Sequence, residues 1–247
     1  TPREIVDYMA TESLIQYIHN RTAIESDKLR PIFKMLDKEE VKFSDREKEQ
    51  ILDALDQVKI LDPACGSGAF PMGVLQKIVQ ALQKLDPDAE WWKKRQIDRI
   101  KNPTVKKLLK EKLSASGVEY ARKIGVIQNS LYGVDIQPVA AEISKLRCFL
   151  SLIVDENIDE TKPNRGIEPL PNLEFKFVTA DTLRNLPEEK QRSMFDNFEE
   201  LQKLEDLRNE YIQSSGKSKA KVKEQFLKVQ RKIAKDQSTL FADTNSK

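Results

Sequence analysis

The feature that most constrains this chain is an apolar run, VKIL at residues 58–61, which stops abruptly at an acid, a proline and two glycines. Its β-branched and aliphatic residues are typical of a short buried strand. Gly66 and Gly68 indicate a tight turn, because glycine adopts positive φ and lets a ligand approach the backbone closely. This unit predicts an α/β fold with a nucleotide crevice at the carboxyl end of the first strand. Apolar residues at helical spacing then predict a helix: Met72, Val74, Leu75, Ile78, Val79 and Leu82.

Charge at the turn favours one class of nucleotide. Asp62 stands where the strand ends, and a carboxylate there would repel the pyrophosphate of a dinucleotide. The dinucleotide pattern G-x-G-x-x-G also fails, because Pro71 occupies the position of the third glycine. A ligand with positive charge and no phosphate fits better, and S-adenosylmethionine is such a ligand. The alternative, an NAD-dependent oxidoreductase, is opposed by both residues.

The run D-P-A-C-G-S-G-A-F at residues 62–70 resembles the cofactor-binding motif of the amino-methylating DNA methyltransferases. It is most similar to adenine-N6 enzymes of bacterial restriction–modification and phage-exclusion systems. The alternative is a plain strand–turn–helix unit whose glycines serve only packing. The resemblance implies a Rossmann-like methyltransferase core that binds S-adenosylmethionine through Asp62, Pro63, Ala64, Cys65, Gly66 and Gly68.

The first residues match a second feature of this family. Residues 1–4, TPRE, have the pattern of a capping box with proline at the first helical position. The resembled enzymes carry a similar T-P-x-x-[IV], which implies that Thr1 faces the methionine end of the cofactor; an ordinary capped helix is the alternative. A second capping box, residues 44–47, begins the helix before the first strand. The first helix is expected to present one apolar side: Ile5, Val6, Met9, Leu14 and Ile18.

The second predicted strand, residues 131–135, also ends in an acid. Asp135 is placed to accept hydrogen bonds from ribose hydroxyls, as in other α/β nucleotide folds, or else to cap the following helix. The run from residue 133 to 147 resembles the second motif of the family, which implies that Ile136 packs on the adenine. The helix after it is expected to be amphipathic, with an apolar side of Val139, Ala140, Ile143, Leu146, Leu150 and Ile153.

A third strand is predicted at residues 175–179. In the resembled family, an acid after this strand accepts a hydrogen bond from the adenine amino group. Asp181 fits that position, and Thr182 and Leu183 would add contacts. An Asp-Thr pair after a strand is also a common turn or N-cap, and this alternative stays open.

Two segments depart from a compact core. Asp135 follows the glycine turn by far more than the usual spacing of about 20 residues, so we predict a helical insertion at about residues 85–129. Residues 93–123 hold eleven bases and three acids, which suits either a phosphate-facing or a solvated surface. Residues 184–247 alternate charged with apolar residues and predict a helical hairpin. The domains are thus N-terminal helices at 1–57, an S-adenosylmethionine-binding core at 58–183 and this hairpin.

Composition excludes several classes of protein. The net charge of +2 over 247 residues does not by itself indicate nucleic acid. Two cysteines and one histidine argue against a disulfide framework and against a metal site, and favour a reducing cytoplasm. The sequence shows neither a membrane span nor a charged-then-apolar leader.

Methyl transfer to a base needs groups that align the amine and an aromatic residue that stacks on the base. In the resembled family these lie in a (D/N/S)-P-P-(Y/F/W) tetrapeptide, and none of the eleven prolines here adjoins another. We therefore expect the cofactor-binding part of a DNA methyltransferase, without catalytic residues, with DNA and restriction or defence subunits as partners. Adenine N6 and cytosine N4 both stay open as targets. A non-catalytic helical scaffold is a further alternative.

Overall fold

The chain forms two compact units, Thr1–Thr182 and Leu183–Lys247, which are considered separately. The computed structural model describes residues 1–34, 42–99, 106–107, 110, 117–155, 160–161, 165, 173, 175–183, 203–204, 206–207, 210 and 220–229.

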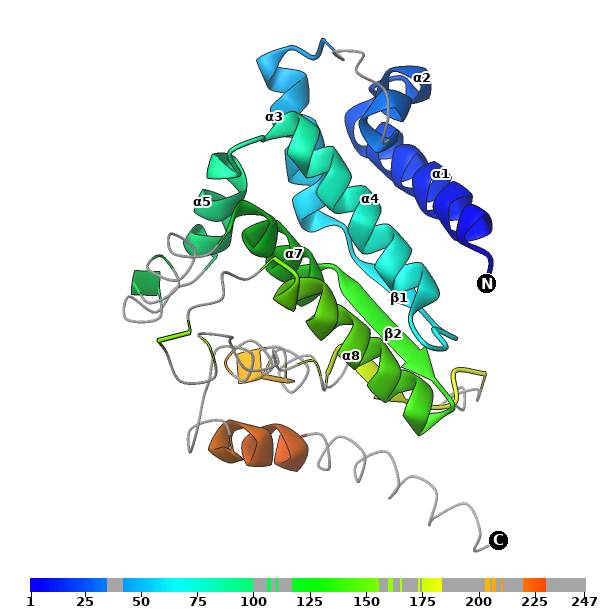
Figure 1. Ribbon diagram of the computed structural model, residues 1–247, viewed down its shortest axis with the longest axis vertical. Helices are drawn as coiled ribbons and strands as arrows, with labels where there is room; N and C mark the ends of the chain where they lie inside the picture. Colours follow the sequence, from blue (N-terminus) through cyan, green and yellow to red (C-terminus); the bar gives the residue numbers. More distant parts are fainter. Residues whose placement is uncertain are drawn as a thin grey trace, which may run out of the picture. The chain divides into compact units, whose positions relative to one another are not determined.

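A parallel sheet of three strands forms the centre of the first unit (Figure 1). The strands β1 (Ile60–Asp62), β2 (Leu131–Asp135) and β3 (Phe177–Thr179) lie in the order β1-β2-β3. The register pairs Ile60 with Leu131 and Gly133 with Phe177. A small parallel sheet with helices between its strands confirms the predicted α/β class. Because the strands are parallel, their three carboxyl ends meet at one edge.

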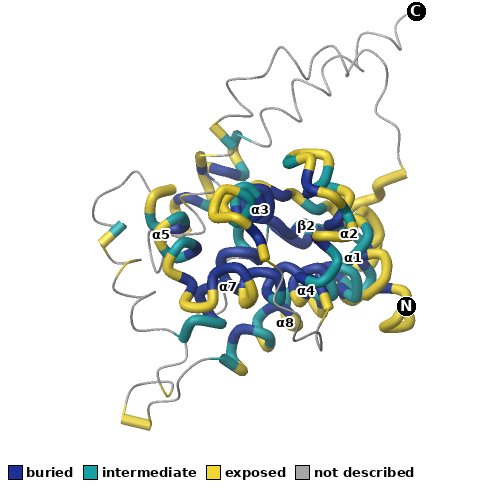
Figure 2. The backbone as a smooth tube through the Cα atoms, turned by 90° about the horizontal axis from the view of Figure 1, so that it is seen from above, coloured by how far each residue is buried: buried dark blue, intermediate teal, exposed yellow. Residues whose placement is uncertain are grey.

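Helices α4 (Ala69–Leu85), α7 (Val118–Asn129) and α8 (Pro138–Ile153) lie along the sheet (Figure 1). Leu131 and Phe177 point into the core that these helices share, and both are fully buried. Successive residues of a strand point to opposite faces, and on the other face Leu61 is 62% exposed. Figure 2 shows buried residues concentrated at β2, α4 and α7.

The N-terminal helices are α1 (Arg3–Thr22), α2 (Ser26–Leu29), the 3₁₀ helix η1 (Arg30–Phe33) and α3 (Asp45–Gln57). The N-terminal part of α1 packs on the N-terminal part of α4: a Cβ on Gly73 would lie 2.3 Å from Val6 Cγ1. The capping box of α3 is confirmed, since Glu47 N donates to Ser44 Oγ and Ser44 N donates to Glu47 Oε2 at 2.8 Å.

The capping box predicted at residues 1–4 is wrong. Pro2 is the N-cap residue, and no side chain makes a cap hydrogen bond to α1. Pro2 has no side-chain acceptor, and the third helical position is held by Ile5, so neither half of a capping box is present.

The structure also corrects which helix faces are buried. In α1, Ile5 and Met9 are about half exposed, and the buried set is Val6, Ala10, Leu14, Ile15 and Ile18. In α8, Leu146 and Leu150 are 51% and 50% exposed, although both belong to the predicted apolar side. The residues of α8 that are buried instead are smaller on average: Ala141, Ser144, Cys148 and Leu152.

Helices occur at both ends of the predicted insertion, namely α5 (Glu90–Asp98) and α7. Trp92 is fully buried between them, and its Nε1 donates to Ala121 O at 3.2 Å. In the second unit, residues 220–229 are helical. The remainder of the insertion and most of the predicted hairpin lie outside the described residues. Within the described ranges, no helix is long and apolar enough to cross a bilayer.

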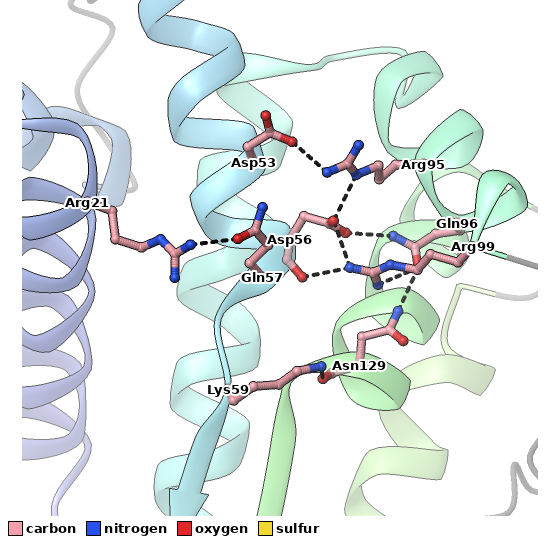
Figure 3. A network of polar contacts seen from close by, with 9 residues as sticks. All are labelled: Arg21, Asp53, Asp56, Gln57, Lys59, Arg95, Gln96, Arg99 and Asn129. Atoms are coloured by element: carbon pink, nitrogen blue, oxygen red, sulfur yellow. Dashed lines mark hydrogen bonds and ion pairs between the residues drawn. The ribbon is translucent and has the colours of Figure 1, made fainter. Parts of the chain in front are cut away.

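A buried carboxylate attaches α5 to α3 (Figure 3). Asp56 is 1% exposed and receives Arg95 Nε at 3.1 Å, Arg99 Nη2 at 2.7 Å and Gln96 Nε2 at 3.3 Å. Asn129 Nδ2 extends the network by donating to Gln96 Oε1 at 2.6 Å. Because every partner of Asp56 in this network lies on α5 or just after it, we interpret the network as an anchor for the start of the insertion.

Candidate cofactor site

The loops after the three strands are joined by hydrogen bonds at the carboxyl edge of the sheet. Cys65 N donates to Val134 O at 2.9 Å, which links the first loop to β2. Ala180 N donates to Asp135 O at 3.0 Å, which continues the link to the third loop. Thr182 Oγ1 donates to Pro63 O at 3.0 Å, which links the third loop back to the first. The structure therefore brings residues 62–68, Asp135 and the 181–182 pair together.

The glycine turn has the backbone that its sequence predicts. Gly66 has φ of 53° and Gly68 has φ of 84°, both in the left-handed region that other residues rarely adopt. Gly68 N donates to Cys65 O at 2.8 Å, and α4 begins directly after it. The turn thus connects β1 to α4 through residues 63–68.

Asp62 presents one oxygen atom whose hydrogen-bonding capacity is unused. Its Oδ1 accepts from Ala64 N at 3.1 Å, whereas its Oδ2 is buried and has no hydrogen-bond partner among the described residues. A buried carboxylate oxygen without a partner is costly, so a donor is expected there, which can be a water molecule or a ligand group. A cationic or N–H-bearing ligand group would provide that donor, which agrees with the charge argument from the sequence.

Asp135 bridges the first and second loops. Its Oδ2 accepts from Gly66 N at 2.8 Å, and its Oδ1 accepts from Gln137 N at 2.8 Å. The N-cap residue of α8 is Gln137, so Asp135 braces the entry to the helix without being its N-cap. Each carboxylate oxygen has two lone pairs, and therefore both could still accept a ribose hydroxyl.

The other residues predicted to contact the cofactor are exposed to solvent. Ile136 is 66% exposed beside Asp135, and Pro63, Ala64, Asp181 and Thr182 are exposed at the same edge. Thr1 is exposed just before α1, whose N-terminal part packs on α4 at Gly73.

Cys65 is a packing residue in this structure. It is buried, and a Cβ on Gly133 would lie 2.9 Å from its Sγ. Burial raises the pKa of its thiol, so the uncharged form is favoured. Any contact with a ligand would therefore come from its backbone.

Two residues that the sequence argument missed also contact the turn. Ser144 Oγ donates to Gly66 O at 3.0 Å, and Arg147 Nη1 donates to Ser67 O at 3.0 Å. No signal in the sequence separates them from the other polar residues of α8, such as Glu142 and Lys145, which are also three apart.

A metal-binding cluster or a groove elsewhere could also form a functional site. Among the described residues, no group of three or more His, Cys, Asp or Glu side chains is arranged to hold a metal ion. A groove of about 1020 Å³ runs along α4, with Tyr8 of α1 and Lys123 of α7 in its walls. None of the predicted site residues lines this groove.

Comparison with known proteins agrees with the motifs. Residues 129–242 match the family described as Eco57I restriction-modification methylase. This match covers 114 of the 247 residues and begins after the glycine turn. A protein of Methanocaldococcus jannaschii, named as a type II restriction enzyme and methyltransferase, is 35% identical over 191 residues, or 74% of this chain. The aligned region is 14% of the length of that relative. The predicted resemblance to restriction–modification methyltransferases is confirmed.

Proposed function

We propose that this chain is the S-adenosylmethionine-binding part of a restriction–modification DNA methyltransferase that acts on adenine N6. The methylase family match supports a methyl donor and DNA as the substrate. The observation that carries the choice of cofactor is the buried, unpartnered Oδ2 of Asp62, beside the carboxylate-braced glycine turn. When bound, S-adenosylmethionine supplies an electrophilic methyl group for transfer to a base amine.

Each residue at the edge has a proposed role in binding. Asp62 and the turn backbone would hold the methionine end, with Thr1 nearby at the start of α1. Asp135 would accept the ribose hydroxyls, since both of its oxygens keep lone pairs after bonding Gly66 N and Gln137 N. Ile136 would pack on the adenine. Asp181 would accept from the adenine amino group, and Thr182 would hold the third loop against Pro63.

The NAD-dependent alternative is disfavoured by the same geometry. A pyrophosphate carries negative charge, and it would meet the carboxylate oxygen of Asp62 that has no hydrogen-bond partner among the described residues. The scaffold alternative predicts no stoichiometric cofactor site at all. A titration therefore separates the three functions.

Isothermal titration calorimetry of the chain with S-adenosylmethionine, S-adenosylhomocysteine and NAD tests the proposal. We expect one site for the first two ligands and none for NAD. Asp135→Ala should weaken binding about tenfold or more, because a charge-assisted hydrogen bond is lost and the turn loses a brace. Absence of heat with both methionine-derived ligands, on a sample shown to be folded by circular dichroism, would refute the proposal.

The chain by itself is proposed to transfer no methyl group. Extrusion of a base and alignment of its amine need a base pocket, and the tetrapeptide that provides one in related enzymes is not in this sequence. We propose that DNA and any restriction subunits contact other parts of the larger protein, in the cytoplasm. Radiolabelled methyl incorporation into DNA duplexes by residues 1–247 alone would contradict this part of the proposal.

A further inference from the structure

The carbonyl groups of the glycine turn are held by side chains of α8. Ser144 Oγ donates to Gly66 O and Arg147 Nη1 donates to Ser67 O, both at 3.0 Å. Ser144 is 1% exposed, whereas Arg147 is exposed. Residues three apart lie on the same side of a helix, so both side chains reach the turn from one face of α8.

Small residues let α8 come this close. Ala141, Ser144 and Cys148 form its buried face next to the turn and the start of α4. A Cβ on Gly68 would lie 2.9 Å from Ser144 Oγ, so helix and turn are in contact with no room for a side chain between them. This spacing lets a short hydroxyl group reach the backbone of the turn.

The N–H side of the turn is held separately by β2 and its loop. Gly66 N donates to Asp135 Oδ2, and Cys65 N donates to Val134 O. The turn is therefore bonded on both of its sides. Glycines lose more conformational entropy on ordering than other residues, so a ligand that had to order Gly66 and Gly68 itself would bind more weakly.

We propose that Ser144 and Arg147 are positioning residues that hold the glycine turn in its cofactor-receiving conformation before the cofactor binds. The expected effect on cofactor binding rests on the proposed function, whereas the expected ordering of the turn in the free protein does not. Loss of either hydrogen bond should weaken cofactor binding by about threefold to tenfold. The same loss should increase the opening of the turn in the free protein.

The test uses Ser144→Ala, Arg147→Met and Arg147→Lys in the 247-residue chain. Amide hydrogen exchange of residues 64–68 is measured without ligand, and the Kd for S-adenosylhomocysteine is measured by calorimetry. Ser144→Ala and Arg147→Met should speed amide exchange in the turn and weaken ligand binding. Arg147→Lys should keep the exchange rate and the Kd of the parent chain, because lysine is also a cationic donor. Glu142→Ala is the matched control: it removes the 2.7 Å ion pair with Lys145 on the same helix and should change neither.

Each result decides a separate point. Unchanged turn exchange in both Ser144→Ala and Arg147→Met would overturn the inference. Equal losses in Arg147→Met and Arg147→Lys would show that Arg147 acts through packing, and would overturn its assignment. If the parent chain binds no S-adenosylhomocysteine, the proposed function fails, and exchange alone decides whether α8 holds the turn. Arg147 is exposed, so its variants should fold even if Ser144→Ala does not.

Discussion

Replacing Asp56 tests whether the α3–α5 network stabilises the domain. The carboxylate is 1% exposed and accepts from two arginines and a glutamine. Breaking a buried ion pair by removing one partner costs about 3–5 kcal/mol, because the other charge stays buried. Here the side chains of Arg95 and Arg99 are 42% and 32% exposed, so water can solvate them in part. Arg95 also keeps its ion pair with Asp53 at 2.9 Å.

We therefore expect Asp56→Ala to lower the free energy of unfolding by about 2–4 kcal/mol, which begins below the range for fully buried pairs. Asp56→Asn should lose less, since its amide oxygen can still accept one of the three hydrogen bonds. Urea denaturation at pH 7, followed by tryptophan fluorescence, measures both. The fluorescence of Trp92 reports the unfolding of α5, because this side chain lies on α5 and is fully buried.

The matched control is Asp98→Ala, which removes an exposed ion pair between α5 and Lys106. It should leave the unfolding midpoint unchanged within error, since exposed pairs contribute little. Adding salt to 0.5 M should preserve the difference between Asp56→Ala and the parent, because buried pairs are weakly screened. A loss below about 0.5 kcal/mol for Asp56→Ala would refute the reasoning, since that is the usual effect of a surface substitution.

Three further predictions follow from titration and burial. The Lys28 ammonium and the Ser44 hydrogen bonds lower the pKa of Glu47 from 4.5 to about 2, so its contribution to stability is present above pH 4.5 and is lost as the pH falls toward 2. Glu47→Gln should therefore flatten the acid side of the stability curve, and an unaltered curve would contradict this. Burial raises the pKa of the Cys148 thiol to about 12 and also raises that of Cys65, so iodoacetamide at pH 8 should label both thiols only after unfolding in urea. Fast labelling of the folded chain would argue against this packing. Leu146→Gln with Leu150→Gln should change the free energy of unfolding by less than about 1 kcal/mol, because both side chains are half exposed; a larger loss by urea denaturation would show that this face of α8 is covered.

Local features of this fold could be predicted from the sequence because their causes are local. The unit of β1, turn and α4 follows from a short apolar run, two glycines and helical periodicity within one stretch of chain. The same holds for β2, which ends at Asp135 as predicted, and for the capping box at Ser44, where both partners are three residues apart. Each depends on neighbours along the chain, so the sequence contains the necessary information.

The tertiary structure decided which helix face is buried and how the turn is held. The apolar side of α8 predicts burial of Leu146 and Leu150, yet the face against the turn is that of Ser144, because close approach to a backbone favours small side chains. Asp135 bonds Gly66, which is 69 residues away in the sequence. Ser144 bonds Gly66 over a separation of 78 residues, and Arg147 bonds Ser67 over a separation of 80 residues. Periodicity carries no information about such distances, since they depend on how the parallel strands pair. The sequence thus determines where the glycine turn lies along the chain, and the packing of β2 and α8 determines the conformation of its backbone.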